Sequence, residues 1–424
     1  MREADIPINR VDWLVVIIYF ALVIIGWFNI YAAVYDSQAP QSMFDMSINS
    51  GQQLVRIGIS VVLIILILAA DHRLFENLAL PIYLVFLVVL LLTPIFGKEV
   101  NGQVLSIGFG SFRIQPGEFA KFATALALAK VMERPTFDLT KTKNQLIAFG
   151  VLMVPVVLIL LQPDTGTAMV YFSLLIMFYR EGFPQRYYIL GLGFIALTLL
   201  ALGIENNLYL VIGIVILALI LIFIGKTSWK RTIAFSAIAL VMISYTYSID
   251  WVVSKLPPHQ QNRIMVLFNP NIDPLGVGWN VTQSKIAIGS GGFFGKGYLQ
   301  GTQTKFDFVP EQHTDFIFCT LGEEFGWFGS FIVIGLFVAL LYRLVIMAER
   351  QKTRFSRIYG YSVISILFFH FMINISMTIG LFPVVGIPLP FFSYGGSSLW
   401  SFTMLLFIFV KLDASRSQQL GRIN

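Results

Sequence analysis

The sequence predicts an all-α polytopic integral membrane protein, and three observations support this fold class. Of its 424 residues, 57% are hydrophobic and only 12% are charged, and the mean hydropathy is +0.77. A soluble domain carries about 25% charged residues, and no soluble fold of this length could bury so much apolar surface. The apolar residues also gather into about twelve runs separated by polar turns, which is typical of a chain that crosses a bilayer many times.

These runs are the candidate transmembrane helices of a single membrane domain, residues 1–424. Most contain the roughly 17–25 residues that a spanning helix needs. The shortest has to tilt or to include flanking residues. In chain order the runs cover residues 13–34, 54–70, 77–95, 116–132, 146–162, 167–180, 187–204, 207–224, 231–249, 314–346, 356–382 and 393–412.

The distribution of Lys and Arg predicts the orientation of the chain. If the N-terminus is cytoplasmic, about twenty of the 29 basic residues fall in cytoplasmic loops and in the C-terminal tail. We therefore expect both termini to be cytoplasmic, with residues 35–53, 96–115 and 250–313 outside. No cleavage site follows residues 13–34, so we expect the first helix to remain in the protein.

Charge and cysteine content exclude several other kinds of protein. The net charge of +6 is explained by basic cytoplasmic loops that lie near anionic membrane lipids, so we expect no nucleic-acid partner. The single cysteine, Cys319, leaves no internal disulfide. The four histidines lack metal-ligand spacing, so we expect no structural metal.

Residues 250–313 form the only long loop, and loops of this size are usually functional or disordered. Aromatic residues and Gly-containing turns argue against disorder. At its centre, Asp273 precedes Pro and two glycines in DPLGVG. This pattern is first of all a turn signature, and it is also compatible with a general base held at the membrane surface.

The same loop contains polar and cationic residues suited to a phosphorylated or sugar-bearing substrate. Outward-facing loops are usually poor in basic residues, so these cations suggest an anionic ligand such as a diphosphate. The alternative is a solvated loop surface. The candidate substrate-binding residues are Arg263, Gln283, Lys285, Lys296, Gln303 and Lys305.

Ionisable residues inside apolar segments are costly, so each is a functional candidate. Glu118 and Lys121 lie three residues apart on one helix face and could pair, with a structural ion pair as the alternative role. Asp164 lies at a turn and could cap the next helix. Glu323 and Glu324 enter an apolar helix, so at least one must face the protein interior.

The segment PVVGIPLPFFSYGGSS joins the last two apolar runs without a charge. Irregular backbone at membrane depth is tolerated only where protein or a cavity shields it. Pro390, Ser393, Gly395 and Gly396 are therefore candidates for lining a groove, although packing through small residues is an adequate alternative.

These residues carry a resemblance to the SEDS family (shape, elongation, division and sporulation) of cell-wall proteins. The matching strings are QPGEFAK at 115–121, QPDTGTA at 162–168, the loop string from residue 269, GEEFGWFG at 322–329 and GIPLPFFSYGGSS at 386–398. The GSGG, GKG and GTQ strings are more similar to the elongation branch, the rod-shape-determining proteins, than to the division branch.

The resemblance implies a bundle of ten core transmembrane helices, and the three runs in 187–249 then contain an extra pair, for twelve in total. It also implies a peptidoglycan glycosyltransferase that polymerises lipid II, with Asp273 as the essential acidic residue. The departing diphosphate would need positive charge or a divalent cation such as Mg²⁺ or Mn²⁺. Arg263, Glu118, Lys121 and Lys296 are the next site candidates.

The implied setting is the bacterial cytoplasmic (inner) membrane, with an extracytoplasmic active site. The implied partners are a class B penicillin-binding protein that supplies the transpeptidase, and other membrane proteins of the elongation complex. Where the family often has Arg-Trp, this chain has Gln103 and Val104, so any role of that tryptophan is in doubt. A lipid II flippase, a scaffold that recruits a transpeptidase and a division-type paralogue stay open as alternatives.

Overall fold

The computed structural model describes residues 10–36, 39–100, 103–109, 112–204, 206–224, 228–268, 276–305 and 308–416. Within these ranges the chain is almost entirely helical, and nine of the helices are long and apolar enough to cross a membrane. The predicted all-α, many-span fold class is confirmed. The chain divides into two compact units: Met1–Phe183 with Asn280–Asn424, and Pro184–Trp279.

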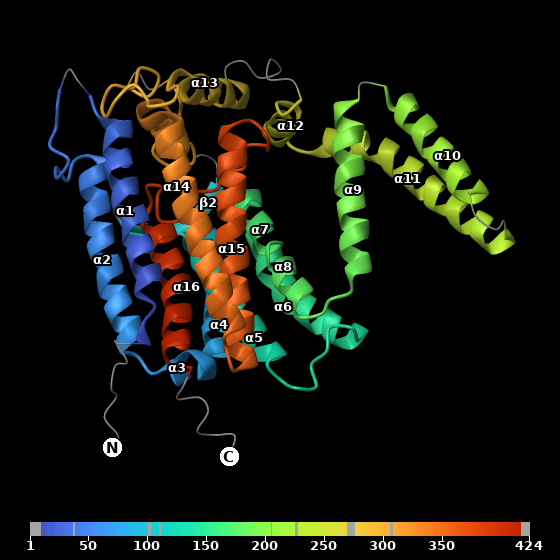
Figure 1. The fold of residues 1–424 in the computed structure, drawn as a ribbon, viewed down its shortest axis with the longest axis horizontal. Helices are drawn as coiled ribbons and strands as arrows, with labels where there is room; N and C mark the ends of the chain where they lie inside the picture. Colours follow the sequence, from blue (N-terminus) through green and yellow to red (C-terminus); the bar gives the residue numbers. More distant parts are fainter. Residues whose placement is uncertain are drawn as a thin grey trace. The chain divides into compact units, whose positions relative to one another are not determined.

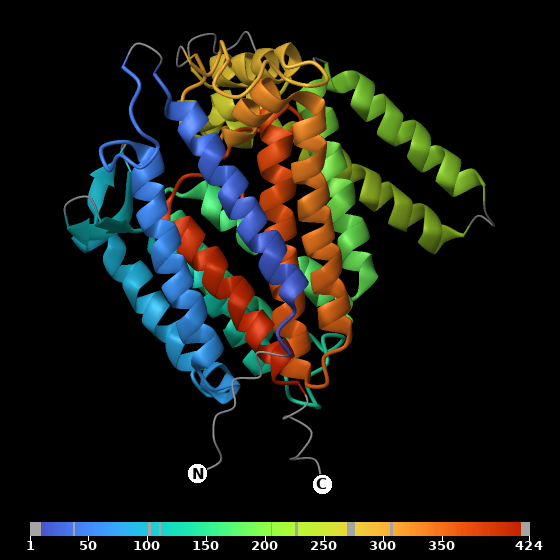
Figure 2. The same cartoon turned by 60° about the vertical axis from the view of Figure 1, so that its left-hand side comes forward.

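The first unit is a bundle of helices that lie side by side (Figures 1 and 2). Three of them, α5, α15 and α16, form its interior, and the outer helices turn apolar side chains toward the lipid. The long helices are α1 (Trp13–Val34), α2 (Asn49–Ala69), α4 (Ala79–Phe96), α5 (Pro116–Met132), α6 (Thr142–Leu160), α14 (Ile317–Glu349), α15 (Arg354–Thr378) and α16 (Gly396–Ala414).

Small side chains explain why α5 lies at the centre. Its alanines Ala120, Ala123, Ala125, Ala127 and Ala129 are at most 2% exposed. Without a hydrophobic driving force between helices in lipid, small residues allow close backbone approach and van der Waals packing. The sequence pattern thus fixes which helix is innermost.

Every predicted apolar run is helical, but two of them are interrupted: 314–346 at Gly326, within α14 (Ile317–Glu349), and 167–180. Residues 167–180 form two short helices, α7 (Thr165–Tyr171) and α8 (Leu174–Arg180), instead of one tilted span. A further short helix that the sequence did not suggest, α3 (His72–Asn77), is capped by the Asp71 side chain, which accepts a hydrogen bond from the Arg73 amide.

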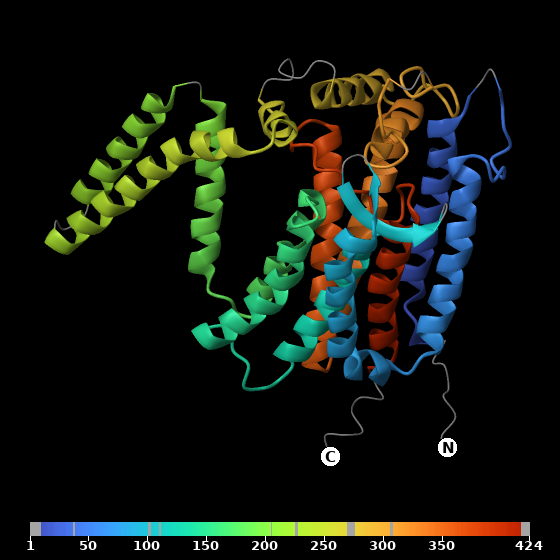
Figure 3. The same ribbon diagram turned by 180° about the vertical axis from the view of Figure 1, so that it is seen from behind.

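A small sheet follows α4 and was not predicted. Its strands β1 (Lys98–Val100), β2 (Gln103–Phe109) and β3 (Phe112–Ile114) are antiparallel in the order β1-β2-β3. Figure 3 shows the strands at the end of α4. The chain therefore enters α5 from a strand, and Gln103 and Val104, at the departure from the family pattern, begin β2.

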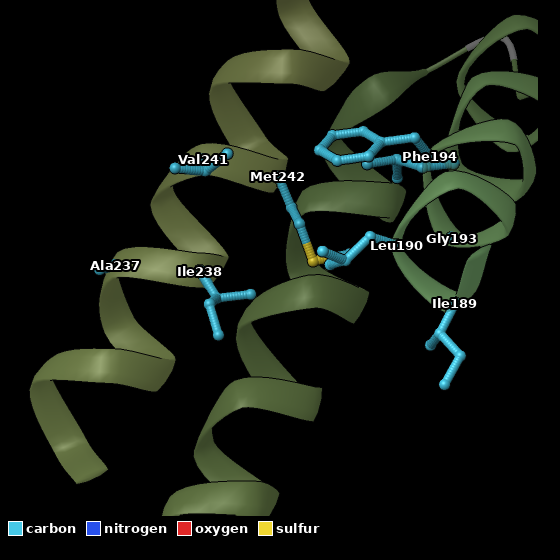
Figure 4. Close-up of a pocket in the computed structure, with 9 residues that line it drawn as sticks. Ile189, Leu190, Gly193, Phe194, Ala237, Ile238, Val241 and Met242 are labelled. Carbon is cyan, nitrogen blue, oxygen red and sulfur yellow. The ribbon is translucent and has the colours of Figure 1, made fainter. Parts of the chain in front are cut away.

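The second unit contains α9 (Gln185–Gly203), α10 (Asn207–Phe223), α11 (Trp229–Lys255) and α12 (Pro258–Met265). Its small core includes Leu197, Ile214 and Ala239. The three apolar runs predicted in 187–249 are helices α9 to α11. A pocket of about 330 Å³ between α9 and α11 is lined by apolar side chains, with Met242 directed toward Leu190 (Figure 4).

The large loop contains more structure than the sequence suggested. Helix α11 extends to Lys255, and α12 and α13 (Val277–Ser290) follow before α14 begins at Ile317. Residues 269–275, which include Asp273, lie outside the described residues.

Ion pairs join three helices of the first unit at the end where α1 begins. Asp12 is 2.8 Å from Arg343 and 3.1 Å from Arg350, and Arg350 also pairs with Asp413 of α16. Burial alone raises the pKa of Asp12, but the hydrogen bonds and charges of Arg343 and Arg350 outweigh this effect and hold the pKa below its usual value.

Candidate active site

Glu118 and Lys121 form an ion pair at the start of α5. Pro116 occupies the first turn, where its missing N–H leaves no donor unsatisfied. Lys121 Nζ lies 2.9 Å from Glu118 Oε2, and the two residues are 2% and 4% exposed. The predicted contact on one helix face is confirmed. At this burial the pair contacts protein on all sides.

A third residue completes this cluster. Lys121 Nζ is also 2.9 Å from His370 Nε2 of α15, and His370 Nδ1 is 3.1 Å from the Pro388 carbonyl oxygen. An ammonium group can only donate hydrogen bonds, so Nε2 accepts and Nδ1 carries the proton donated to Pro388. His370 thereby connects α5 to the irregular segment before α16.

No pattern in the sequence points to His370. It lies in an apolar run, and its contact with Lys121 bridges 249 residues of chain. Phe402 of α16 covers the cluster, with its ring centroid 4.7 Å from both Lys121 Nζ and the His370 ring centroid. Only the folded bundle brings these groups together.

Asp164 caps α7, as the sequence suggested. Its Oδ1 accepts from the Thr167 amide at 2.9 Å, and its Oδ2 accepts from Gln115 Nε2 at 3.0 Å. Gln115 is the residue before Pro116, so Asp164 joins the QPGEFAK and QPDTGTA motifs. Two of the motifs that carry the family resemblance therefore form one polar patch.

Glu323 binds several groups at the end of the large loop. Its carboxylate is fully buried and lies 2.7 Å from Lys296 Nζ. It also accepts hydrogen bonds from the backbone amides of residues 302, 303 and 304, at 2.7, 2.9 and 3.0 Å. Lys296 and Gln303, both predicted to bind substrate, are thus held by Glu323.

Glu324 is buried as well, so both glutamates of GEEFGWFG face the protein interior. Its carboxylate faces the backbone amides of Leu299 and Gly301 without reaching hydrogen-bond geometry. From the sequence we expected at least one of these two carboxylates to face the interior.

The segment before α16 is buried in its middle, at residues 389–393, and more exposed toward both ends. Pro390 and Ser393 are buried, and Ser393 Oγ donates to the Thr314 carbonyl at 2.7 Å. Gly395 and Gly396 are half-buried. A side chain at Gly396 would lie 3.3 Å from Arg56 Cδ, so Arg56 passes directly over this glycine.

Arg56 and Arg113 are two cations that the sequence analysis missed. The Arg56 guanidinium lies 4.1 Å from the centroid of the Tyr394 ring. The Arg113 backbone oxygen accepts from Ser397 Oγ at 3.3 Å, and its side chain is exposed. Among the described residues, no carboxylate lies within 4.0 Å of either guanidinium.

The remaining candidates occupy α12 and α13. Arg263 is half-buried in α12, within the second unit. Gln283 is buried in α13 and Lys285 is exposed. Ser284 Oγ donates to the Thr378 carbonyl at 2.8 Å, which fixes α13 against the end of α15.

Possible metal ligands are dispersed among the described residues. No three of their His, Cys, Asp or Glu side chains come together as possible metal ligands. Glu118 and Glu323 already bind a lysine, and Glu323 in addition binds amide donors.

Comparisons with known proteins identify the class of protein that carries this site. The family model of cell cycle proteins named for FtsW, RodA and SpoVE matches residues 12–199 and 182–418. The chain belongs to this family, as the resemblance to SEDS proteins predicted.

Among curated relatives, the peptidoglycan glycosyltransferase RodA of Treponema pallidum is 33% identical, over 96% of this chain and 98% of its own length. MrdB of Escherichia coli, also a peptidoglycan glycosyltransferase, is 32% identical over 82% of this chain and 81% of its own length.

Two solved structures share the fold. A chain from a peptidoglycan synthase complex that coordinates polymerization and crosslinking has a TM-score of 0.70 and 26% identity, over 96% of this chain and 99% of that one. The rod-shape-determining protein RodA of Thermus thermophilus has a TM-score of 0.62 and 24% identity, over 96% of this chain and 97% of that one.

Proposed function

We propose that this chain is a peptidoglycan glycosyltransferase that polymerises lipid II into β-1,4-linked glycan strands for cell elongation and releases undecaprenyl diphosphate. The observation that carries the proposal is family membership together with the match to the Treponema pallidum enzyme over 98% of that enzyme's length. No large part of the relative lacks a counterpart here.

In the proposed reaction, Asp273 is the general base. The 4-hydroxyl of the acceptor sugar attacks the anomeric carbon of the donor, and its proton passes to the Asp273 carboxylate. The bond between the anomeric carbon and the diphosphate oxygen breaks, and the diphosphate leaves with the electron pair. The configuration inverts from α to β.

The leaving diphosphate develops negative charge, which fixed cations stabilise. Arg56 and Arg113 support this step, because neither guanidinium is neutralised by a described carboxylate. Both residues lie beside the start of α16. The Arg56 side chain passes over Gly396, and the Arg113 backbone oxygen accepts a hydrogen bond from Ser397. Lys121 and Lys296, by contrast, are paired with Glu118 and Glu323. We assign them to positioning the elements around the site.

We further propose that the active site is extracytoplasmic, that both termini are cytoplasmic, and that the membrane is the bacterial cytoplasmic membrane. A class B penicillin-binding protein is the proposed partner, alongside other elongation-complex membrane proteins. The structural match to a chain of a peptidoglycan synthase complex supports this assignment.

Polymerisation of purified lipid II tests the function. The protein alone, and in complex with its penicillin-binding protein, should make glycan strands, and Asp273→Ala should lower the rate at least about 10²-fold, because a general base contributes about 10²–10⁴-fold. Asp138→Ala, which removes a partly buried carboxylate that accepts hydrogen bonds from Thr140, is the matched control. Equal rates for Asp273→Ala and the wild type would contradict the base assignment. Lipid II crossing vesicle membranes without polymerisation would instead identify a flippase.

A further inference from the structure

A small pocket of mixed polarity lies at the end of α1, beside residues 39–48, which precede α2. Its volume is about 220 Å³. Tyr31, Tyr35, Asp36 and Gln41 form its polar lining, with apolar contributions from Val34 and Ile48. None of these residues belongs to the sequence motifs or to the site described above.

The pocket is formed by a loop that hydrogen bonds hold in place. The Tyr31 hydroxyl donates to the Gln41 carbonyl at 2.8 Å. Further along, Ser50 Oγ donates to the Met43 carbonyl at 3.0 Å, and Trp27 Nε1 donates to the Ser50 carbonyl at 2.9 Å. Binding sites for small molecules are usually preformed in this way, because less conformational entropy is lost when the ligand binds.

The lining suits a neutral ligand with many hydroxyl groups. Tyrosines combine an apolar ring face with a polar end, which matches the alternating C–H and O–H surfaces of a pyranose. Asp36 supplies carboxylate acceptors. The volume lies below the roughly 300–1,000 Å³ of pockets that hold drug-sized ligands, so one sugar ring would fit.

The pocket is connected to the large loop. Lys305 Nζ lies 5.5 Å from the centroid of the Tyr35 ring. Lys305 directly follows residues 302–304, whose backbone amides are held by the Glu323 carboxylate. A ligand in the pocket would therefore lie beside the ordered end of the loop that contains the proposed base.

We propose that this pocket binds one N-acetylhexosamine ring of the glycan strand, as a subsite outside the reaction centre. This inference rests on the proposed polymerase function and deepens it. By holding the strand between additions, the subsite would favour repeated extension of one strand over release. Loss of the subsite would shorten the strands more than it slows the formation of each bond.

Binding can be measured without turnover. The probe is a lipid-free β-1,4-linked tetramer of N-acetylglucosamine, added to the full detergent-solubilised chain and followed by saturation-transfer NMR and calorimetry. Tyr35→Ala and Asp36→Asn should each weaken binding about tenfold or more, and Tyr35→Phe, which keeps the ring, should retain it. Tyr342→Ala, which removes an exposed tyrosine of α14, is the matched control.

The outcomes separate this inference from the proposed function. Absence of tetramer binding by the wild type, or equal binding by wild type, Tyr35→Ala and Asp36→Asn, would overturn the subsite even if lipid II is polymerised. Tetramer binding that depends on Tyr35 and Asp36, in a protein that polymerises nothing, would preserve the sugar site and remove the polymerase. With lipid II as substrate, Tyr35→Ala should give shorter strands than the wild type and Tyr342→Ala, and strands of unchanged length would contradict the role in extension.

Discussion

At the scale of single residues, most buried charges of the described residues have partners, although the Glu324 carboxylate has none within hydrogen-bond geometry. Lys121 bonds to both Glu118 and His370, and Glu323 accepts from Lys296 and three backbone amides. A buried charge is tolerated only when paired and hydrogen-bonded. The sequence could suggest the pairing of Glu118 with Lys121 because three residues separate them. It could not suggest partners that only the bundle brings together.

Removal of one member of the Glu118–Lys121 pair should destabilise the protein more than removal of both. Lys121→Met leaves the Glu118 carboxylate buried without its counter-charge, at an expected cost of about 3–5 kcal/mol. The double variant Glu118→Gln/Lys121→Met should recover part of this loss. Thermal unfolding in detergent measures both. Arg180→Met, which breaks an exposed pair with Glu349, should cost only about 0–1 kcal/mol. Additive losses in the double variant would contradict a coupled pair.

His370 should matter through both of its ring nitrogens. His370→Gln can still accept from Lys121 and donate to Pro388, whereas His370→Leu can do neither. We expect His370→Leu to lower the polymerisation rate at least tenfold and His370→Gln to restore much of it. ¹⁵N NMR of histidine-labelled protein should show the proton on Nδ1 of His370. A proton on Nε2, or equal activity of the two variants, would contradict this arrangement.

At the scale of elements, two of the family motifs pack against each other. Helix α14 is interrupted at Gly326, which has φ of 63°, and the backbone of residues 291–297 runs against this break. The Lys296 amide donates to the Glu323 carbonyl at 3.0 Å. Gly295, with φ of 80°, has no room for a side chain, because a Cβ would lie 2.0 Å from the Glu324 carbonyl oxygen. The GSGGFFGKG and GEEFGWFG strings were recognisable from the sequence, but their mutual contact was not.

The loop end at residues 296–304 should depend on Glu323. Glu323→Gln replaces one acceptor oxygen by an NH₂ group that faces amide donors and Lys296. We therefore expect faster proteolysis within 296–305 and at least a tenfold loss of polymerisation. Lys296→Met removes a single donor and should have a smaller effect on proteolysis. Identical protease sensitivity of Glu323→Gln and the wild type would show that the carboxylate does not hold the loop.

At the scale of the whole molecule, hydropathy predicted the order of the apolar helices well, but nine helices among the described residues, rather than twelve, are long and apolar enough to cross a membrane. Hydropathy did not predict the elements that form without a long apolar run, or a break inside such a run. The sheet of residues 98–114 is too short and too polar to stand out, and the break between α7 and α8 occurs inside an apolar run. The helices α12 and α13 lie in a stretch of mixed polarity. Hydropathy reports transfer into lipid, and it carries little information on structure outside the lipid.

The orientation of the molecule decides whether the proposed site faces the lipid II that is used for wall growth. Because Cys319 is the only cysteine, Cys319→Ala provides a background for single-cysteine labelling. In that background, Ser47→Cys, between α1 and α2, should react with a membrane-impermeant maleimide in intact spheroplasts. Lys141→Cys, between α5 and α6, should react only after lysis. The two positions flank α2, α4 and α5, an odd number of spanning helices, so the positive-inside rule places them on opposite sides. Labelling of Lys141→Cys but not Ser47→Cys in intact spheroplasts would place Tyr31, Arg56 and the large loop in the cytoplasm, which is incompatible with extracytoplasmic polymerisation.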